Sequence, residues 1–243
     1  MFGIPAARLH KVVGGLCVIA APLLFAFTEI TYPANGDGPA QSLASGAKQP
    51  SLWLTDIYVG IASSILFIVA YFALLNLLRE RGAVLGHIAF VFGLLGTCLS
   101  GLTLAGLNLV LWAMATPGVD RQSMVAFLTH AQGVSAIAPI ILGHDLFAIG
   151  IVVFGIAVWR SGFGYRWAGP LVALGVVLDI VLGNSGLEQS QAAATAVSIL
   201  TDGMFVVGFG AIGWRILTMP EAAWVTSPSA DVRAPTAAIT AQA

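Results

Sequence analysis

The chain has 243 residues, of which 58% are hydrophobic and only 9% are charged, and its formal net charge is -1. An ordinary soluble domain carries roughly 25% charged residues, so this composition excludes a water-soluble protein. The sequence has no basic stretch and no run of charges, which argues against nucleic acid and against a polybasic lipid-binding surface.

Hydropathy along the chain predicts six membrane-spanning helices. They lie near residues 12–32, 53–78, 84–115, 136–159, 168–184 and 192–217. A helix needs about 20 apolar residues to cross a bilayer. The first segment has that length and ends without a small-residue cleavage pattern, so we expect a retained span and not a signal peptide. The third exceeds one crossing, while the short fifth carries Pro170 and Gly175 and is expected to start deeper in the membrane or to be irregular.

Lysine and arginine are divided unequally between the two sides of the predicted membrane. One side holds Arg8, Lys11, Arg79, Arg81, Arg160, Arg166, Arg215 and Arg233, and the other holds Lys48 and Arg121. Cytoplasmic loops carry the excess of basic residues, so we expect a cell-membrane protein with both termini in the cytoplasm. The predicted fold is therefore an all-α integral membrane bundle over residues 1–217. Residues 218–243, rich in Ala, Thr, Pro and Ser, are predicted to be a disordered cytoplasmic tail.

A weak internal similarity relates the helices that run from outside to inside. Each has an aspartate near its outer end and finishes at an arginine; the pairs are Asp56 with Arg79, Asp145 with Arg160, and Asp202 with Arg215. The helices of opposite direction place Glu29, Asn108 and Asp179 toward their outer ends. This order indicates three tandem helical hairpins, although apolar sequences produce such matches easily.

Five carboxylic acids lie inside predicted spans, where a charged group is costly enough to indicate function. At 1.5 Å per residue, Glu29 and Asp56 lie about 5 Å below the outer boundary, Asp179 about 8 Å, and Asp145 and Asp202 about 13 to 15 Å. In a closed bundle these acids turn inward, because lipid does not solvate them. The sequence therefore predicts an acidic cavity that opens outward.

We expect Asp145 and Asp202, the deepest acids, to be catalytic. Glu29, Asp56, Asn108, His144 and Asp179 are expected to bind substrate or a cation. No lysine or arginine lies in the outer half of a span, so the cavity either binds a cation or keeps several carboxyl groups protonated. Each acid also has a purely structural interpretation, and Asp56 in particular could cap its helix. Helix rotation could also scatter the acids against separate neighbours.

No metal or cofactor is predicted. The sequence contains no HExxH, CxxC or paired-histidine helix, and Cys17 and Cys98 lie in apolar segments as packing residues. Between the third and fourth spans, residues 120–130 predict a short interfacial helix, with Asp120 as its cap and an apolar face of Met124, Phe127 and Leu128. This helix would act as a lid or rest among the lipid headgroups.

The basic N-terminus, the first helix ending in Glu29 near Pro33, and the short arginine turns resemble small bacterial multi-pass membrane proteins of unknown function. That resemblance implies no activity. Membrane-bound terpene cyclases of bacteria and fungi are similar in size, helical architecture and use of intramembrane acids, but none of their motifs is matched here. The comparison is an analogy of chemistry.

Three functions remain open. The first is an enzyme that acts by acid catalysis on a lipophilic, lipid-like or isoprenoid-like substrate. The second is a proton- or cation-coupled transporter, which at this size would need to dimerise. The third is a non-catalytic membrane subunit whose acids meet another chain. The expected partners are membrane lipid, a lipophilic or cationic small molecule and, for the transporter, a second copy of the chain.

Overall fold

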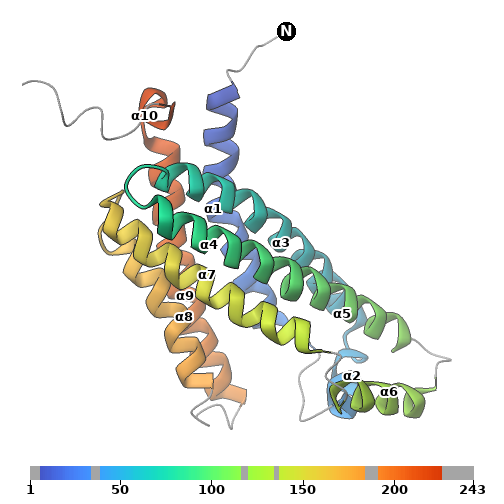
Figure 1. The fold of residues 1–243 in the computed structure, drawn as a ribbon. Helices are drawn as coiled ribbons and strands as arrows, with labels where there is room; N and C mark the ends of the chain where they lie inside the picture. The colour runs from blue at the N-terminus through green and yellow to red at the C-terminus, as the bar shows by residue number, and fades with distance from the viewer. Residues whose placement is uncertain (1–5, 34–38, 116–119, 134–136, 184–190, 226–243) are drawn as a thin grey trace, which may run out of the picture.

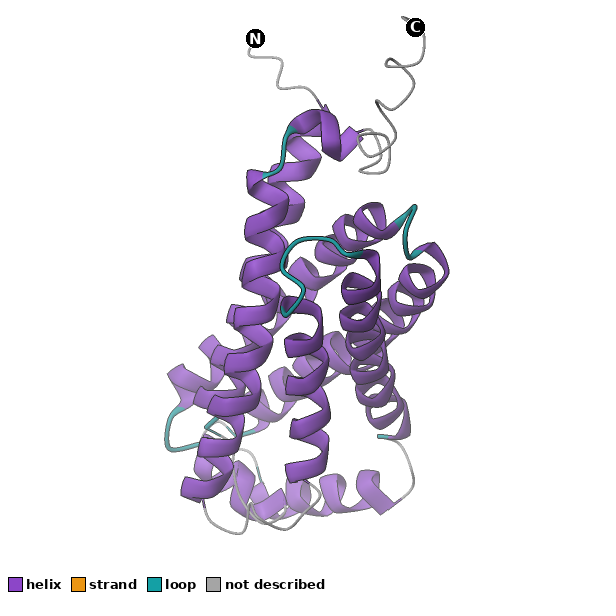
Figure 2. Ribbon diagram, turned by 90° about the vertical axis from the view of Figure 1, so that its left-hand side faces the viewer, coloured by secondary structure: helices purple, strands orange, loops and turns teal. Residues whose placement is uncertain are grey.

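The computed structural model describes residues 6–33, 39–115, 120–133, 137–183 and 191–225, and all regular structure in these ranges is helical. Figure 1 shows the helices in chain order, and Figure 2 shows the bundle from a second side. The helices are α1 (Ala6–Thr31), α2 (Pro39–Gly46), α3 (Pro50–Leu78), α4 (Ala83–Gly96), the π-helix η1 (Thr97–Leu102), α5 (Thr103–Met114), α6 (Arg121–Gly133), α7 (Ala138–Ser161), α8 (Ala168–Gly183), α9 (Gln191–Thr218) and α10 (Glu221–Val225).

Five helices of the described chain are long and apolar enough to cross a membrane, and they support the all-α membrane class. They are α1, α3, the continuous run from α4 through η1 to α5, α7, and α9 from Thr195 onward. The predicted fifth segment forms α8, a shorter apolar helix of 16 residues. Five candidate spans and one short apolar helix thus occupy the six predicted segments.

The two helices of each predicted hairpin pack against each other. Helix α1 packs on α3, α4 packs on α7, and α8 packs on α9, while further contacts join α1 to α9 and α7 to α8. Glycines set the closest approach, because a Cβ added to Gly150 of α7 would lie 2.4 Å from the backbone nitrogen of Gly93 of α4. Small residues let membrane helices approach in this way. Whether the three hairpins are a true repeat stays a prediction.

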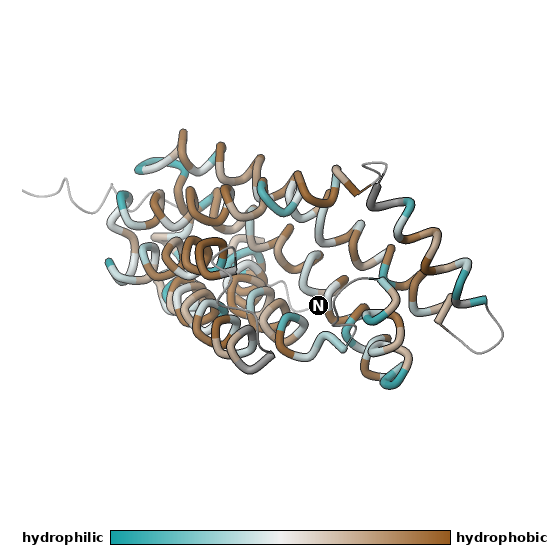
Figure 3. Tube along the Cα trace, turned by 90° about the horizontal axis from the view of Figure 1, so that it is seen from below, coloured by the Kyte–Doolittle hydropathy of each residue, from teal (hydrophilic) through white to brown (hydrophobic). Residues whose placement is uncertain are grey.

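Apolar side chains also cover the outside of the bundle. Leu16, Phe72, Val177, Ile199 and Trp214 are large apolar residues with exposed side chains on different helices. Figure 3 shows hydrophobic colouring along most of the helical path. An exposed apolar surface of this extent is typical of a protein whose solvent is lipid.

The basic residues of the described chain lie mainly at one end of the bundle, which we call the basic end: the start of α1, the turns α3–α4 and α7–α8, and the end of α9. Lys11 is buried there and its Nζ donates a hydrogen bond to the Met219 carbonyl oxygen at 2.8 Å. His10 of α1 packs edge-on against Trp224 of α10. The predicted tail thus begins with an ordered helix, and its part beyond residue 225 lies outside the described residues.

Helices α2 and α6 lie side by side at the opposite end, as Figure 1 shows. Leu43 of α2, Trp53 and Ile57 of α3, and Met124 of α6 form a separate hydrophobic cluster, which we call the end cluster. The helix predicted for residues 120–130 is present as α6, and its place at the membrane interface stays a prediction. Of its predicted apolar face, Met124 is buried in the end cluster and Phe127 is 53% exposed.

The predicted cap of α6 is also confirmed. The carboxylate of Asp120 accepts hydrogen bonds from the backbone N–H groups of Gln122 at 3.0 Å and Ser123 at 3.3 Å, and another from the Ser123 hydroxyl. These hydrogen bonds to its charged form, the one from the Ser123 side chain above all, lower the pKa of Asp120.

Candidate functional site

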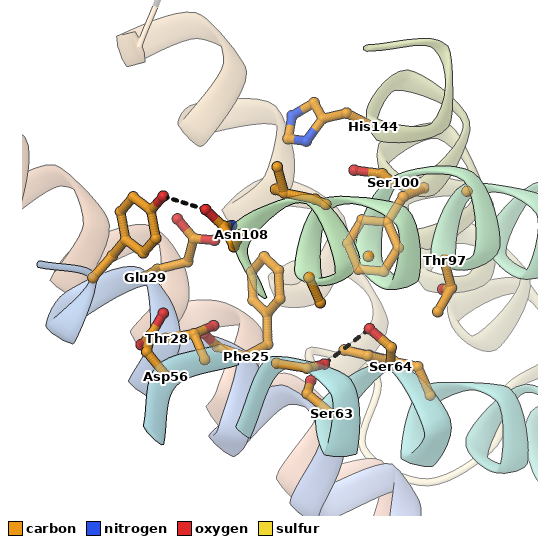
Figure 4. Close-up of a pocket in the computed structure, with 18 of the residues that line it drawn as sticks. Phe25, Thr28, Glu29, Asp56, Ser63, Ser64, Thr97, Ser100, Asn108 and His144 are labelled. Carbon is orange, nitrogen blue, oxygen red and sulfur yellow. Dashed lines mark hydrogen bonds between the residues drawn. The ribbon is translucent and has the colours of Figure 1, made fainter. Parts of the chain in front are cut away.

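A cavity of about 420 Å³ lies between α1, α3, η1, α5, α7, α8 and α9. This volume is at the lower end of the range for small-molecule sites. Figure 4 shows side chains from several of these helices converging on the space. Its lining includes the predicted residues Glu29, Asp56, Asn108, His144, Asp179 and Asp202. Asp145 is the predicted site residue that does not line it.

The end of α1 brings Glu29 and Tyr32 to the cavity. The Tyr32 hydroxyl donates a hydrogen bond of 2.7 Å to the Asn108 side-chain oxygen, which ties α1 to α5 across the space. Asn108 is buried, and Glu29 lines the cavity while keeping part of its surface accessible. An amide held in this way offers its NH₂ group as a donor to a bound molecule.

Asp56 lies inside α3 and is only 5% exposed. Its Oδ1 accepts a hydrogen bond of 3.0 Å from the Thr31 hydroxyl at the end of α1. The N-cap of α3 is Gln49, so Asp56 does not cap its helix. Its position instead joins the two helices beside the cavity.

Asp202 and Asp56 are the two buried carboxyl groups of this lining. Asp202 is 8% exposed, and its buried Oδ2 has no hydrogen-bond partner among the described residues. The neighbouring Thr201 hydroxyl donates instead to Asp179 of α8 at 3.2 Å. Asp179 is exposed at the rim, where an adjoining pocket of about 40 Å³ shares Asp179, Asp202 and His144 with the main cavity. A buried acceptor oxygen without a donor is costly.

His144 lines the cavity and Asp145 does not, because of the way α7 is rotated about its own axis. Gly143 faces η1 so closely that an added Cβ would lie 2.6 Å from the backbone nitrogen of Ser100. Successive residues of a helix turn by about 100°, so His144 comes to the cavity and Asp145 points about 200° away from η1. Both side chains are exposed, but only His144 belongs to the lining.

The π-helix η1 was not predicted from the sequence. It supplies Thr97, Ser100 and Gly101 to the lining, and the Thr97 hydroxyl forms a 3.0 Å hydrogen bond with the buried Tyr71 hydroxyl. Single π-helical turns inside α-helices are frequent at functional sites. The available signal was the cluster of Thr, Ser and Gly at positions 97, 100 and 101, inside an otherwise apolar span.

Three phenylalanine rings form the apolar part of the lining. Phe25, Phe67 and Phe147 lie with ring centroids 5.4 to 6.3 Å apart. Apolar spans contain many phenylalanines, so composition alone did not mark these three. Below them the core continues with Tyr71 and Phe154, whose rings stack at 5.5 Å.

The lining contains four carboxyl side chains and no lysine or arginine. Within the described part of the chain, no group of three or more His, Cys, Asp and Glu residues is placed to hold a metal ion. Fold and site together define a helical protein of the multi-pass membrane type with a carboxyl- and phenyl-lined cavity. Comparisons with models of protein families, with curated proteins and with solved structures find no match for this chain.

Proposed function

We propose that the chain is a membrane-embedded enzyme that acts by acid catalysis on a lipophilic substrate, with Asp202 as the general acid. The observation that carries this proposal is Asp202, a residue of the cavity lining whose buried Oδ2 has no hydrogen-bond partner among the described residues. A carboxylate without a counter-charge is costly at that place. The group therefore carries a proton or meets a positive charge on a bound molecule, and a proton held there can be given to a substrate.

The other lining groups fit positive charge that develops on a substrate when it is protonated. Glu29, Asp56 and Asp179 supply negative charge, and the faces of the phenyl rings carry negative potential. Asn108, fixed by Tyr32, positions a polar group of the substrate. Asp145 takes no part in this proposal, because it lies outside the lining.

Isotope incorporation tests the acid step. The purified chain in lipid nanodiscs is incubated in D₂O with geraniol and farnesol, whose C=C bonds gain a C–D bond when the acid protonates them, and mass spectrometry detects carbon-bound deuterium in the products. We expect Asp202→Asn to lower product formation by about 10² to 10⁴, the usual contribution of a general acid. Asp145→Asn, the same chemical change outside the cavity, is the control and should keep the parent rate. A parent without deuterated product from any of these probes contradicts the proposal.

A proton- or cation-coupled transporter is the second candidate. Two observations favour it: η1 interrupts a spanning helix beside the cavity, and the packed rings of Tyr71 and Phe154 close the bundle toward the basic end. Irregular helices next to a one-sided cavity are common in transporters. Transport predicts proton movement across sealed vesicles when an organic cation is added outside, and acid catalysis alone does not.

We also propose six crossings of the cell membrane with both termini in the cytoplasm, so that the cavity opens outward. The basic residues at one end of the bundle support this orientation. Helix α8, at 16 residues, reaches about 24 Å and requires a locally thin bilayer to cross. Reporter fusions after residue 166 and after residue 225 test the orientation. A periplasmic signal from either fusion contradicts it.

A further inference from the structure

We propose that the cavity binds a protonated amine with apolar substituents, and that binding releases a proton from the carboxyl groups to water. The inference rests on the proposed function for its location, since it concerns the same cavity. It goes further in naming the charge and chemical class of the bound molecule.

The charges of the lining select the sign of the ligand. Four carboxyl side chains reach the cavity from four helices: Glu29 from α1, Asp56 from α3, Asp179 from α8 and Asp202 from α9. Phosphate, sulfate and carboxylate groups would need lysine or arginine partners, and the lining contains neither. A positive ligand is the one that this set of residues complements.

The unsatisfied oxygen of Asp202 adds a requirement for a hydrogen-bond donor. This side chain is more than nine-tenths buried, and its Oδ2 has no partner among the described residues. By contrast, Asp56 has a donor in the Thr31 hydroxyl at 3.0 Å and Asp179 has one in the Thr201 hydroxyl at 3.2 Å, and each hydroxyl shares its proton with a backbone carbonyl of its own helix. An ammonium N–H supplies both the donor and the positive charge that Asp202 lacks.

The phenyl rings define the remainder of the ligand. Phe25, Phe67 and Phe147 line the same cavity as the carboxyl groups, so alkyl or aryl substituents on nitrogen would be buried against them. The negative faces of aromatic rings also attract organic cations. A small hydrated metal ion would leave this apolar surface without a partner, and the described residues show no metal-ligand cluster.

The proton balance follows from the groups that face the cavity. The titratable ones are Glu29 of α1, Tyr32 directly after α1, Asp56 of α3, His144 of α7, Asp179 of α8 and Asp202 of α9, whereas η1 and α5 supply none. Like charges held close together oppose full ionisation, so the proposal requires this set of carboxyl groups to hold at least one proton before the ligand binds. When the ammonium group arrives, one carboxyl O–H bond breaks, the proton leaves to water, and the new carboxylate accepts the ammonium N–H.

Calorimetry of the full chain in lipid nanodiscs tests the inference. The probes are N,N-dimethylbenzylammonium and isobutylbenzene, its neutral carbon isostere, titrated at pH 7 in two buffers of different ionisation enthalpy. We expect the ammonium to bind at least about tenfold more tightly than the isostere, with proton release shown by the buffer dependence of the heat. Asp202→Asn should weaken ammonium binding by about tenfold or more and reduce proton release. The control Asp145→Asn should match the parent.

Equal binding of ammonium and isostere overturns the inference, as does binding without proton release. If Asp202→Asn does not fold, Glu29→Gln is measured instead. An unchanged ammonium affinity in Glu29→Gln would also overturn the inference. The two proposals fail separately. Ammonium binding with no deuterated product contradicts acid catalysis and supports the ammonium site. Deuterated product without ammonium binding supports acid catalysis and contradicts the ammonium site.

Discussion

The two ends of the bundle each bury a charged group, but they treat it differently. At the basic end, the buried Lys11 donates to the Met219 carbonyl, and α10 packs over the same region. At the cavity end, the buried Asp202 keeps an oxygen without a partner among the described residues. A group whose hydrogen bonds are met inside the protein is structural, while one left unmet beside a cavity is available to a ligand.

Enlarging a glycine at the contact between α4 and α7 should have the largest effect on stability. In Gly150→Val the new side chain collides with the backbone of Gly93, so α4 and α7 must separate and most of the folded protein should be lost. Thermal unfolding in detergent measures this effect. Gly106→Val is the control, because an added Cβ meets nothing within 4 Å there. Similar melting temperatures for the two variants would show that the glycine contact is unimportant.

Substitutions of the two buried ionisable groups should differ in their effect on stability. Lys11→Met leaves the Met219 carbonyl without its donor and should lower the free energy of unfolding by about 1 to 3 kcal/mol. Asp202→Asn keeps the shape of the side chain and breaks no hydrogen bond of the buried Oδ2, so it should change stability by less than about 1 kcal/mol. Denaturant unfolding of both variants sharpens the comparison. A loss of stability in Asp202→Asn equal to that in Lys11→Met would remove the distinction.

The hydrogen bond between Tyr32 and Asn108 should contribute a smaller amount, about 1 kcal/mol. The measurement is a double-mutant cycle with Tyr32→Phe, Asn108→Ala and the double variant, read by thermal unfolding and by probe binding. The two changes should be non-additive. Strict additivity would mean that the bond does not hold the cavity wall together.

The smallest effect concerns α6 and pH. Hydrogen bonding lowers the pKa of Asp120 in the folded state, so its contribution is complete above the unfolded value of about 3.9 and is lost as pH falls through the lower folded value. We expect the start of α6 to fray below about pH 4. Backbone NMR shifts of residues 121–124 measure this, and Asp120→Asn should be much less sensitive to acid. Identical acid profiles for the two proteins would contradict the cap.

Hydropathy predicted the helix ends within a few residues, except that α1 begins at Ala6 and not near residue 12. Depth counting also selected residues that share the cavity, such as Asp56 and Asp202. It failed to separate His144 from Asp145, because depth along a helix says nothing about rotation around it. That rotation is set by the contact of Gly143 with η1, which only the packed structure contains.

The π-helix changes the direction in which the later residues of the third predicted span point. A π turn accommodates about one extra residue, which shifts the angular position of everything after it by about 100° relative to a continuous α-helix. Helix α4 can thereby present its glycines to α7, while α5 presents Asn108 to Tyr32. Deletion of a single residue such as Ser100 would restore a uniform helix, yet it would turn Asn108 out of the cavity. The extra residue in η1 therefore lets α4 and α5 face different neighbours within one continuous helix.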